Sequence, residues 1–148
     1  MENNIVIYHV KTKPYYFANW EYYQVDKKIL ERKYKKVLVS HSIKNSIFIL
    51  LKYPEAQIFC WWWHSSSLII LIAKILRRKV FCTGALHMFD YSSSPDFYKK
   101  NFFYRISSRI SFVLSDKNLF ISKDQFLSIS SHLKVKNPLV IYSSLDEN

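Results

Sequence analysis

The sequence predicts an α/β domain, in which a doubly wound, mostly parallel sheet of about six strands has helices on both faces. Two apolar runs without alternation, at residues 57–63 and 80–83, are typical of strands covered on both faces. Between them lies an apolar helical segment at residues 68–76. Two strands joined in this way predict a right-handed parallel crossover, and hence a layered architecture for the whole chain.

Both ends of that helix are marked in the sequence. Three serines at residues 65–67 are expected to cap its amino end. The basic run RRK at residues 77–79 places positive charge at its carboxyl end, where the helix dipole favours it. The serines have a second interpretation, because free N–H groups at a helix start can also receive a phosphate.

The rest of the chain alternates strands and helices in the same way. Strands are predicted at residues 5–10, 36–41, 57–63, 80–83, 117–122 and 139–142, and helices at residues 20–35, 43–52, 68–76, 96–115 and 123–132. Residues 11–19 are expected to form an aromatic loop, and residues 85–95 a loop long enough to be functional. The pattern is that of one Rossmann-like domain, whose ligands lie beyond the carboxyl ends of the strands.

The chain is strongly basic. It has 22 Lys and Arg against 11 Asp and Glu in 148 residues, a net charge of +11 at pH 7, which favours an anionic partner. The basic residues are scattered rather than gathered in one tract, unlike a nucleic-acid-binding arm, so no nucleic acid partner is expected. A phosphorylated substrate or an anionic membrane surface fits this charge better.

Several classes of site are excluded by what the sequence lacks. Its single glycine, Gly84, excludes Walker loops and GxGxxG turns, and no Cys and His spacing suits zinc. Cys60 and Cys82 fall on two predicted strands and are expected to be reduced core residues. No secretory signal or membrane-spanning run is recognisable, so a cytoplasmic location is expected, with the inner face of the plasma membrane as a candidate surface for peripheral binding.

Four of the five histidines fall on one rim of the predicted sheet. His9, His41 and His64 lie at or just beyond strand ends, and His87 lies in the loop after the fourth strand. Ligands of this fold class bind at such a rim. The alternative is that strand ends simply collect polar residues, so the rim is predicted as a whole and the role of each histidine stays open.

Four stretches of the chain carry a resemblance to a known family. They are IFCWWWHSSSLIILIAKILRRKVFCTGA, FDYSSSPDFYKKNFFYR, SDKNLFISKDQFLSI and LVIYSSLDEN. In order and spacing they resemble the N-terminal, acceptor-side domain of bacterial glycosyltransferases with the two-domain GT-B fold, particularly the family 4-like enzymes that make capsule, lipopolysaccharide and other surface polysaccharides. The third stretch is similar to the ADxIIAVS strand and helix of these enzymes, and the fourth to their VIPNGVD exit to the second domain.

The chain departs from that family in two places. Such enzymes usually have a glycine-rich turn after the first strand, which VIYHVKTKPYY lacks, so the contact made at that turn stays open. They also bind the nucleotide-sugar in a C-terminal domain with a Glu-rich motif, and this sequence ends where that domain would begin. The resemblance therefore implies a domain that is inactive alone and works with a donor domain supplied in cis or in trans.

By resemblance, the complete enzyme would be a retaining glycosyltransferase. It would move a hexosyl group from a nucleotide-sugar, bound as a substrate, to a glycan or lipid-linked acceptor without a cofactor or metal. This chain would hold the acceptor. The implied catalytic residues are His87 and Asp90, either of which would accept a hydrogen bond from the acceptor hydroxyl. The implied acceptor-binding residues are His9, His64, Gly84, Tyr91 and Arg105.

Each of these assignments has a plainer alternative. Asp90 would also suit the cap of a turn and Arg105 a solvated helix face, and the tryptophans at 61–63 suit the core as well as a sugar-stacking platform. The aromatic residues in 15–23 either lie at a membrane interface or pack on the sheet. Two other function classes stay open: a non-enzymatic interaction module or remnant of a split transferase, and an unrelated α/β binder of nucleotides or nucleic acid.

Overall fold

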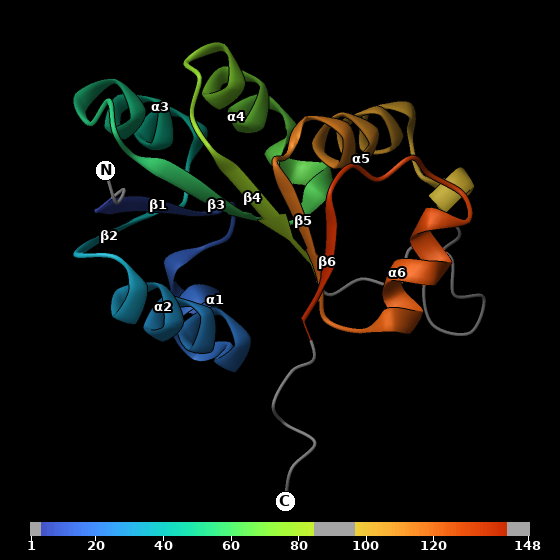
Figure 1. The fold of residues 1–148 in the computed structure, drawn as a ribbon, viewed down its shortest axis with the longest axis horizontal. Helices are drawn as coiled ribbons and strands as arrows, with labels where there is room; N and C mark the ends of the chain where they lie inside the picture. The colour runs from blue at the N-terminus through green and yellow to red at the C-terminus, as the bar shows by residue number, and fades with distance from the viewer. Residues whose placement is uncertain (1–3, 85–96, 142–148) are drawn as a thin grey trace, which may run out of the picture.

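Six strands form one sheet in which all paired neighbours are parallel (Figure 1). A computed structural model describes residues 4–84 and 97–141 of the chain. In spatial order the strands are β2 (Lys36–Ser40), β1 (Ile5–Val10), β3 (Gln57–Trp61), β4 (Val80–Thr83), β5 (Lys117–Phe120) and β6 (Pro138–Val140). The predicted Rossmann-like α/β class is confirmed, and each strand begins and ends within two residues of its predicted range.

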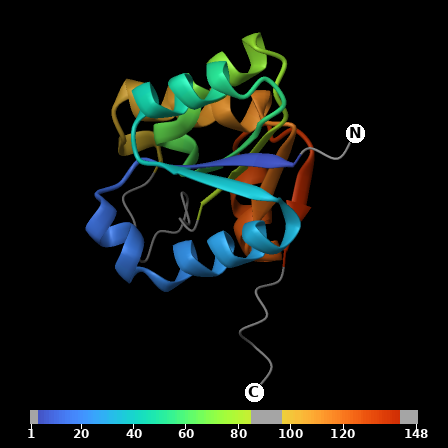
Figure 2. The same cartoon turned by 90° about the vertical axis from the view of Figure 1, so that its left-hand side faces the viewer.

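Helices cover both faces of this sheet (Figure 1, Figure 2). α1 (Pro14–Asn19) and α2 (Glu21–Lys33) lie on one side, and α3 (Ile43–Lys52), α4 (Trp63–Ile75) and α5 (Phe102–Leu114) lie on the other. α6 (Lys123–Ser130) connects β5 to β6 and adds Ile129 to the core beneath α3, α4 and α5. Because the chain leaves β1 toward β2 and then crosses back to β3, it winds in both directions, as predicted.

Alternate residues of β1 face two separate cores. Ile7 belongs to the larger core, whereas Val6 and Tyr8 belong to a smaller, aromatic core beneath α1 and α2. Cys60 and Cys82 lie opposite each other on β3 and β4, are fully buried and are not bonded to each other. Burial raises the pKa of both thiols, so they are unreactive at neutral pH, as expected of reduced core residues.

Residues 11–19 do not form a loop throughout, so that prediction is wrong in part. Pro14 begins the short helix α1. Proline suits this position because the first helical residue has no intrahelical use for an N–H and because the proline ring already holds a helical backbone angle. The aromatic residues of the segment are therefore presented on a turn of helix that leads directly into α2.

The single helix predicted for residues 96–115 is also wrong. Within the described residues, a 3-10 turn at Phe97–Lys99 comes first, and α5 starts only at Phe102. The cause is Asn101, whose side-chain oxygen accepts a hydrogen bond from Tyr104 N (2.8 Å) and caps the helix at its amino end. The helix is therefore shorter at its start than the apolar pattern suggested.

The helix of the central crossover starts earlier than predicted. It begins at Trp63, not at residue 68, and the strand before it ends at Trp61. The serines at 65–67 therefore do not cap it; the Ser66 hydroxyl instead donates back to the carbonyl oxygen of Trp61 (3.0 Å). Burial of Trp63 explains the early start, because the helix has to begin where this side chain enters the core.

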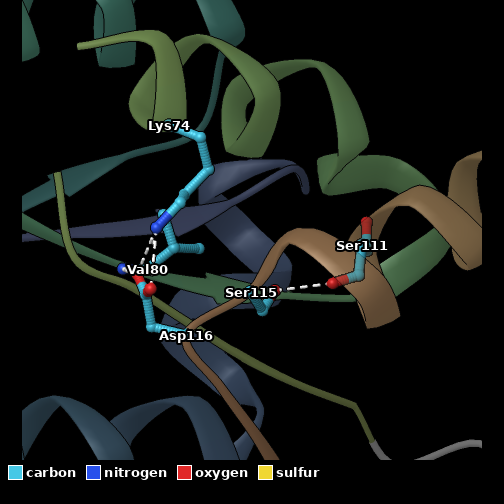
Figure 3. Close-up of polar contacts among 5 residues, drawn as sticks. All are labelled: Lys74, Val80, Ser111, Ser115 and Asp116. Atoms are coloured by element: carbon cyan, nitrogen blue, oxygen red, sulfur yellow. Dashed lines mark hydrogen bonds and ion pairs between the residues drawn. The ribbon is translucent and has the colours of Figure 1, made fainter. Parts of the chain in front are cut away.

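A polar contact joins α4, β4 and the turn before β5 at the amino edge of the sheet (Figure 3). The Lys74 ammonium lies 2.7 Å and 2.9 Å from the two carboxylate oxygens of Asp116, and Val80 N donates to the same carboxylate (2.8 Å). Nearby, Ser115 Oγ donates to Ser111 O (2.7 Å) at the end of α5. This edge is opposite to the strand ends that bind ligands in such folds, so we assign these contacts to stability.

Candidate functional site

The strand order places a topological switch point between β1 and β3. The connection after β1 leads to β2 on one side, and the chain returns to β3 on the other. The loops after β1 and β3 therefore part toward opposite faces of the sheet, and in α/β folds the crevice between such loops is where ligands bind. The residues around this switch point form the candidate site, and they include the predicted His9 and His64.

His9, the next-to-last residue of β1, is held in one tautomer by a chain of hydrogen bonds. Ser40 Oγ donates its only proton to the carbonyl oxygen of Ser42 (3.0 Å), so it has to accept the hydrogen bond from Ser46 Oγ (2.8 Å). Ser46 then has no proton left for His9 Nδ1, which lies 2.7 Å from its Oγ, so that nitrogen is the donor. In the neutral ring, Nε2 therefore carries the lone pair.

The lone pair of His9 Nε2 has no hydrogen-bond partner among the described residues, although the side chain is fully buried. Burial, helped by His41 and Lys11, lowers the pKa of His9 to about 4, so the imidazole is neutral at pH 7. An enclosed acceptor without a partner is unfavourable by about 1–3 kcal/mol. Its complement is a hydrogen-bond donor, such as a hydroxyl, from a ligand or from solvent.

His64, the second residue of α4, is the other imidazole of the site. Its ring stacks on that of Tyr104 in α5, with the centroids 4.6 Å apart, and its Nδ1 is buried and has no hydrogen-bond partner in the part of the chain that the structure describes. Burial lowers the pKa of His64 to about 4, and Lys100 and Lys11 add to the effect. His64 is therefore neutral at pH 7 and, like His9, has an unused ring nitrogen.

Two lysines supply positive charge to this site. Lys11 follows β1, and its positive charge contributes to the lowered pKa of both His9 and His64. Lys100 contributes to that of His64, and its ammonium lies 5.5 Å from the centre of the Tyr104 ring. Among the described residues, the charged groups that lower the pKa of these two histidines are lysines, an arrangement that suits an anion.

An open cavity of about 720 Å³ extends from Lys11 over the carboxyl ends of β1 and β2. It is lined by Lys11, Thr12, Lys13, Pro14, Val39, His41, Ser42 and Asn45. The His41 ring packs on that of Phe17 (centroids 4.8 Å apart), and its Nδ1 lies 3.1 Å from the carbonyl oxygen of Val10. His41 thus forms part of the wall, and the cavity adds room for a ligand larger than a phosphate.

Trp62 joins β3 to α4 in a left-handed backbone conformation, with φ at 76°, which is strained for a residue other than glycine. Its backbone N donates to Thr83 O (2.9 Å) and its Nε1 donates to the Tyr23 hydroxyl (2.6 Å). These two hydrogen bonds stabilise the strained backbone conformation. Strained backbone of this kind is common at functional sites, and this residue lies at the switch point. Of the three consecutive tryptophans, Trp61 and Trp63 are core residues.

Sequence reasoning missed Asp26, which α2 places below the same end of the sheet. Its carboxylate accepts a hydrogen bond from Trp61 Nε1 (2.8 Å), and burial raises its pKa to about 6. One signal was present: Asp26 lies three residues after the buried Tyr23 and four before the buried Leu30, on the apolar face of the helix. The polar residues of α2 are therefore not all solvated.

Gly84, predicted to be part of the acceptor loop, has a packing role in the structure. It lies directly after β4, and a Cβ on it would be 2.7 Å and 2.8 Å from two carbons of the Trp63 ring. Its carbonyl oxygen accepts a hydrogen bond from Gln125 Nε2 (2.7 Å). The close approach to a buried indole explains a glycine at this position without any ligand.

Gly84→Ala is expected to lower the free energy of unfolding by about 1–3 kcal/mol. The added methyl group meets an indole that cannot retreat, because Trp63 packs on Phe112 and Phe120. Urea unfolding followed by tryptophan fluorescence measures the loss. Ser67→Ala, on the partly exposed side of α4, is the control and is expected to stay within about 0.5 kcal/mol of the wild type. A fully stable Gly84→Ala variant would contradict the packing explanation.

His87, Asp90 and Tyr91 lie outside the described residues, so their predicted catalytic and acceptor-binding roles stay predictions. Arg105 is described and is half-buried in α5, directly after Tyr104. Its Nε is buried and has no hydrogen-bond partner within residues 4–84 and 97–141, which differs from the solvated helix residue of the plainer interpretation.

Within residues 4–84 and 97–141, no group of three or more His, Cys, Asp or Glu side chains could hold a metal ion, and no helix is long and apolar enough to cross a membrane. No family model matches the chain, and no curated protein or solved structure is significantly similar to it. Its function is therefore inferred from the switch point and from the chemistry of the residues around it.

Proposed function

We propose that this chain is the acceptor-binding half of a glycosyltransferase, and that the crevice at its switch point holds a phosphate-linked, hydroxyl-bearing acceptor such as a lipid-linked glycan. The main support is a neutral imidazole with an unused lone pair, His9 Nε2, in a site where Lys11 acts on His9 and Lys100 acts on His64. An acceptor of this kind calls for both, because its hydroxyl needs a hydrogen-bond acceptor and its phosphate needs cations.

In the proposed complex, the lysines bind the phosphate and His9 orients the reacting hydroxyl. Nδ1–H of His9 keeps its hydrogen bond to Ser46 whether Nε2 is free or occupied, so the serine chain holds the ring in one orientation. His9 is fully buried, so the hydroxyl reaches Nε2 only when side chains of the rim move. Lys11 is the rim side chain best able to move aside, because it is exposed.

The nucleotide-sugar would be bound by a separate donor domain, in cis or in trans, for synthesis of a surface polysaccharide at the inner face of the plasma membrane. The 148-residue chain alone is then expected to transfer no sugar from any nucleotide-sugar to a lipid-linked acceptor. Transfer by the isolated chain, detected as a radiolabelled product in the lipid phase, would contradict this part of the proposal.

Binding of a short-chain prenyl diphosphate N-acetylglucosamine, measured by isothermal titration calorimetry, tests the acceptor site. The double variant Lys11→Ala/Lys100→Ala is expected to bind about tenfold or more weakly, because hydrogen bonds to charged groups contribute about 1.5–3 kcal/mol each. Lys52→Ala removes a lysine at the carboxyl end of α3, at the opposite edge of the sheet, and is expected to bind like the wild type. Equal affinities for all three proteins would refute the site.

The role of His9 is tested by imidazole nitrogen resonances in the same titration. The acceptor is expected to shift the Nε2 resonance of His9, whereas inorganic pyrophosphate, which has no sugar hydroxyl, is expected to leave it unchanged. An unchanged resonance with both probes would remove His9 from the site. Tighter binding of ADP or FMN than of the acceptor would instead indicate a nucleotide binder, for which a switch point between β1 and β3 is equally suitable.

A further inference from the structure

Three helices on one side of the sheet share an apolar outer face. α3, α4 and α5 form one layer, with α4 in contact with both of its neighbours (Figure 1, Figure 2). Each helix exposes large apolar side chains at helical spacing. They are Phe48 and Leu51 in α3, Leu68, Leu71 and Ile75 in α4, and Phe102, Ile106 and Val113 in α5. We call this set the outer face.

The charged residues of these three helices are all basic. α3, α4 and α5 contain no Asp or Glu. Their charged residues are Lys44, Lys52, Lys74, Arg105 and Arg109, and the turn after α4 adds the basic residues 77–79. Of the carboxylates in the adjoining turns, that of Asp116 is paired with Lys74 (2.7 Å), and Glu55 follows the end of α3. The outer face therefore combines apolar side chains with a clear excess of positive charge.

The other side of the sheet differs in this respect. α2 carries Glu21, Asp26 and Glu31 among its lysines, and Lys27 pairs with Glu31 (3.1 Å), as on an ordinary solvated helix. The exposed ring of Trp20 is stacked on that of Tyr23, with centroids 5.8 Å apart. Among the described helices, only the layer of α3, α4 and α5 combines exposed apolar side chains with several basic residues and no carboxylate.

We infer that the outer face of α3, α4 and α5 docks on the surface of an anionic phospholipid bilayer. The apolar side chains enter the headgroup region while the basic residues other than Lys74, which is paired with Asp116, meet anionic headgroups. Peripheral membrane binding depends on this combination. Spread over three neighbouring helices, the side chains suit a flat fluid surface. This inference does not rest on the proposed function, since neither His9 nor Lys11 belongs to the outer face. It also moves the membrane contact away from residues 15–23, which lie across the sheet.

Sedimentation of the 148-residue chain with phosphatidylcholine vesicles, prepared with and without phosphatidylglycerol, tests this inference. The wild type is expected to bind the anionic vesicles at low salt, to bind pure phosphatidylcholine far more weakly and to be released by added salt, because the charge attraction is screened. The double variant Leu71→Ser/Ile75→Ser on the central helix is expected to bind about tenfold or more weakly, since two apolar side chains no longer enter the bilayer.

The matched control is Val25→Ser/Ile29→Ser on α2. These residues are 44% and 53% exposed, comparable with 41% for Leu71 and 71% for Ile75, but they lie on the other side of the sheet. The control is expected to bind like the wild type, and both variants to unfold at nearly the wild-type temperature, because all four side chains are exposed.

Several outcomes would overturn the inference. They are an absence of binding to anionic vesicles at low salt, an equal loss in both double variants, and a loss in Tyr15→Ser/Trp20→Ser but not in Leu71→Ser/Ile75→Ser. Light scattering adds a further arm. A wild type that is dimeric without lipid, together with a monomeric Leu71→Ser/Ile75→Ser variant whose vesicle binding is unchanged, would show that a second copy of the chain covers the outer face instead.

Discussion

Trp63→Ala is expected to lower the free energy of unfolding by about 3–5 kcal/mol, a large part of the total stability of a domain of this size. The Trp63 ring is almost completely buried and packs on Phe112 and Phe120, with centroids 4.8 Å and 5.4 Å away. Its Nε1 also donates to Asn118 Oδ1 (3.1 Å), so the substitution leaves a cavity and removes a partner from a buried amide.

Urea unfolding at pH 7 measures this loss. Trp20→Ala is the matched control, because that ring is partly exposed and its removal leaves no enclosed cavity; a cost below about 1 kcal/mol is expected. Trp63→Phe separates the two causes, since it keeps most of the ring but leaves Asn118 without its donor. If Trp63→Ala cost no more than Trp20→Ala, Trp63 would not be the centre of the larger core, and the explanation of Gly84 would fail with it.

The strands of this sheet are predictable from the sequence because a parallel strand buried on both faces is an unbroken apolar run. The start of α4 is not predictable in the same way. Trp61 is buried in the smaller core and Trp63 in the larger one, so the run stays apolar across the boundary between strand and helix. Only the left-handed backbone at Trp62 marks that boundary, and it depends on contacts with distant residues.

The position of the candidate site at one rim of the sheet is predictable from the sequence, but the hydrogen bonds and protonation states of its side chains are not. His9 and His64 are found at the expected strand ends, because parallel strands align their carboxyl ends whatever the side chains are. The tautomer of His9 is set by Ser46, 37 residues away, and the pKa of Asp26 is raised by burial and partly lowered again by the hydrogen bond from Trp61, 35 residues away. Such long-range pairs leave no periodic signal in the sequence. Gly84 is conspicuous in the sequence as the single glycine, but the need for a glycine there comes from close packing against the Trp63 ring, which the sequence does not show.

Acidification from pH 6.5 to 4 is expected to destabilise the fold through His9 and His64. The pKa of each is about 4 in the folded chain against an ordinary value of 6.5, so in this range the unfolded chain takes up protons that the folded chain does not. The stability that these neutral histidines contribute is complete above pH 6.5 and is lost as the pH falls toward 4. For the fully buried His9 this corresponds to about 3 kcal/mol, and for the half-buried His64 to less.

Asp26 opposes this effect. Its pKa is about 6 in the folded chain against 3.8 ordinarily, so as the pH falls from 6 to 4 the folded chain takes up a proton before the unfolded chain does. This one group therefore stabilises the fold on acidification, while two histidines destabilise it. The net expectation is a loss of stability, with a slope on the order of 1 kcal/mol per pH unit between pH 6 and 4.5.

Urea unfolding at several pH values between 7 and 4 measures that slope, and the sign of the change in two variants identifies its source. His9→Asn/His64→Asn is expected to reverse the slope, so that stability rises on acidification because only Asp26 is left to titrate. Asp26→Asn is expected to steepen the loss of stability, since the opposing proton uptake is gone.

A double-histidine variant with the wild-type slope would mean that both imidazoles are already protonated in the folded chain at pH 6. His9 Nε2 would then be a donor rather than an acceptor, and the orientation of an acceptor hydroxyl by this nitrogen would have to be abandoned.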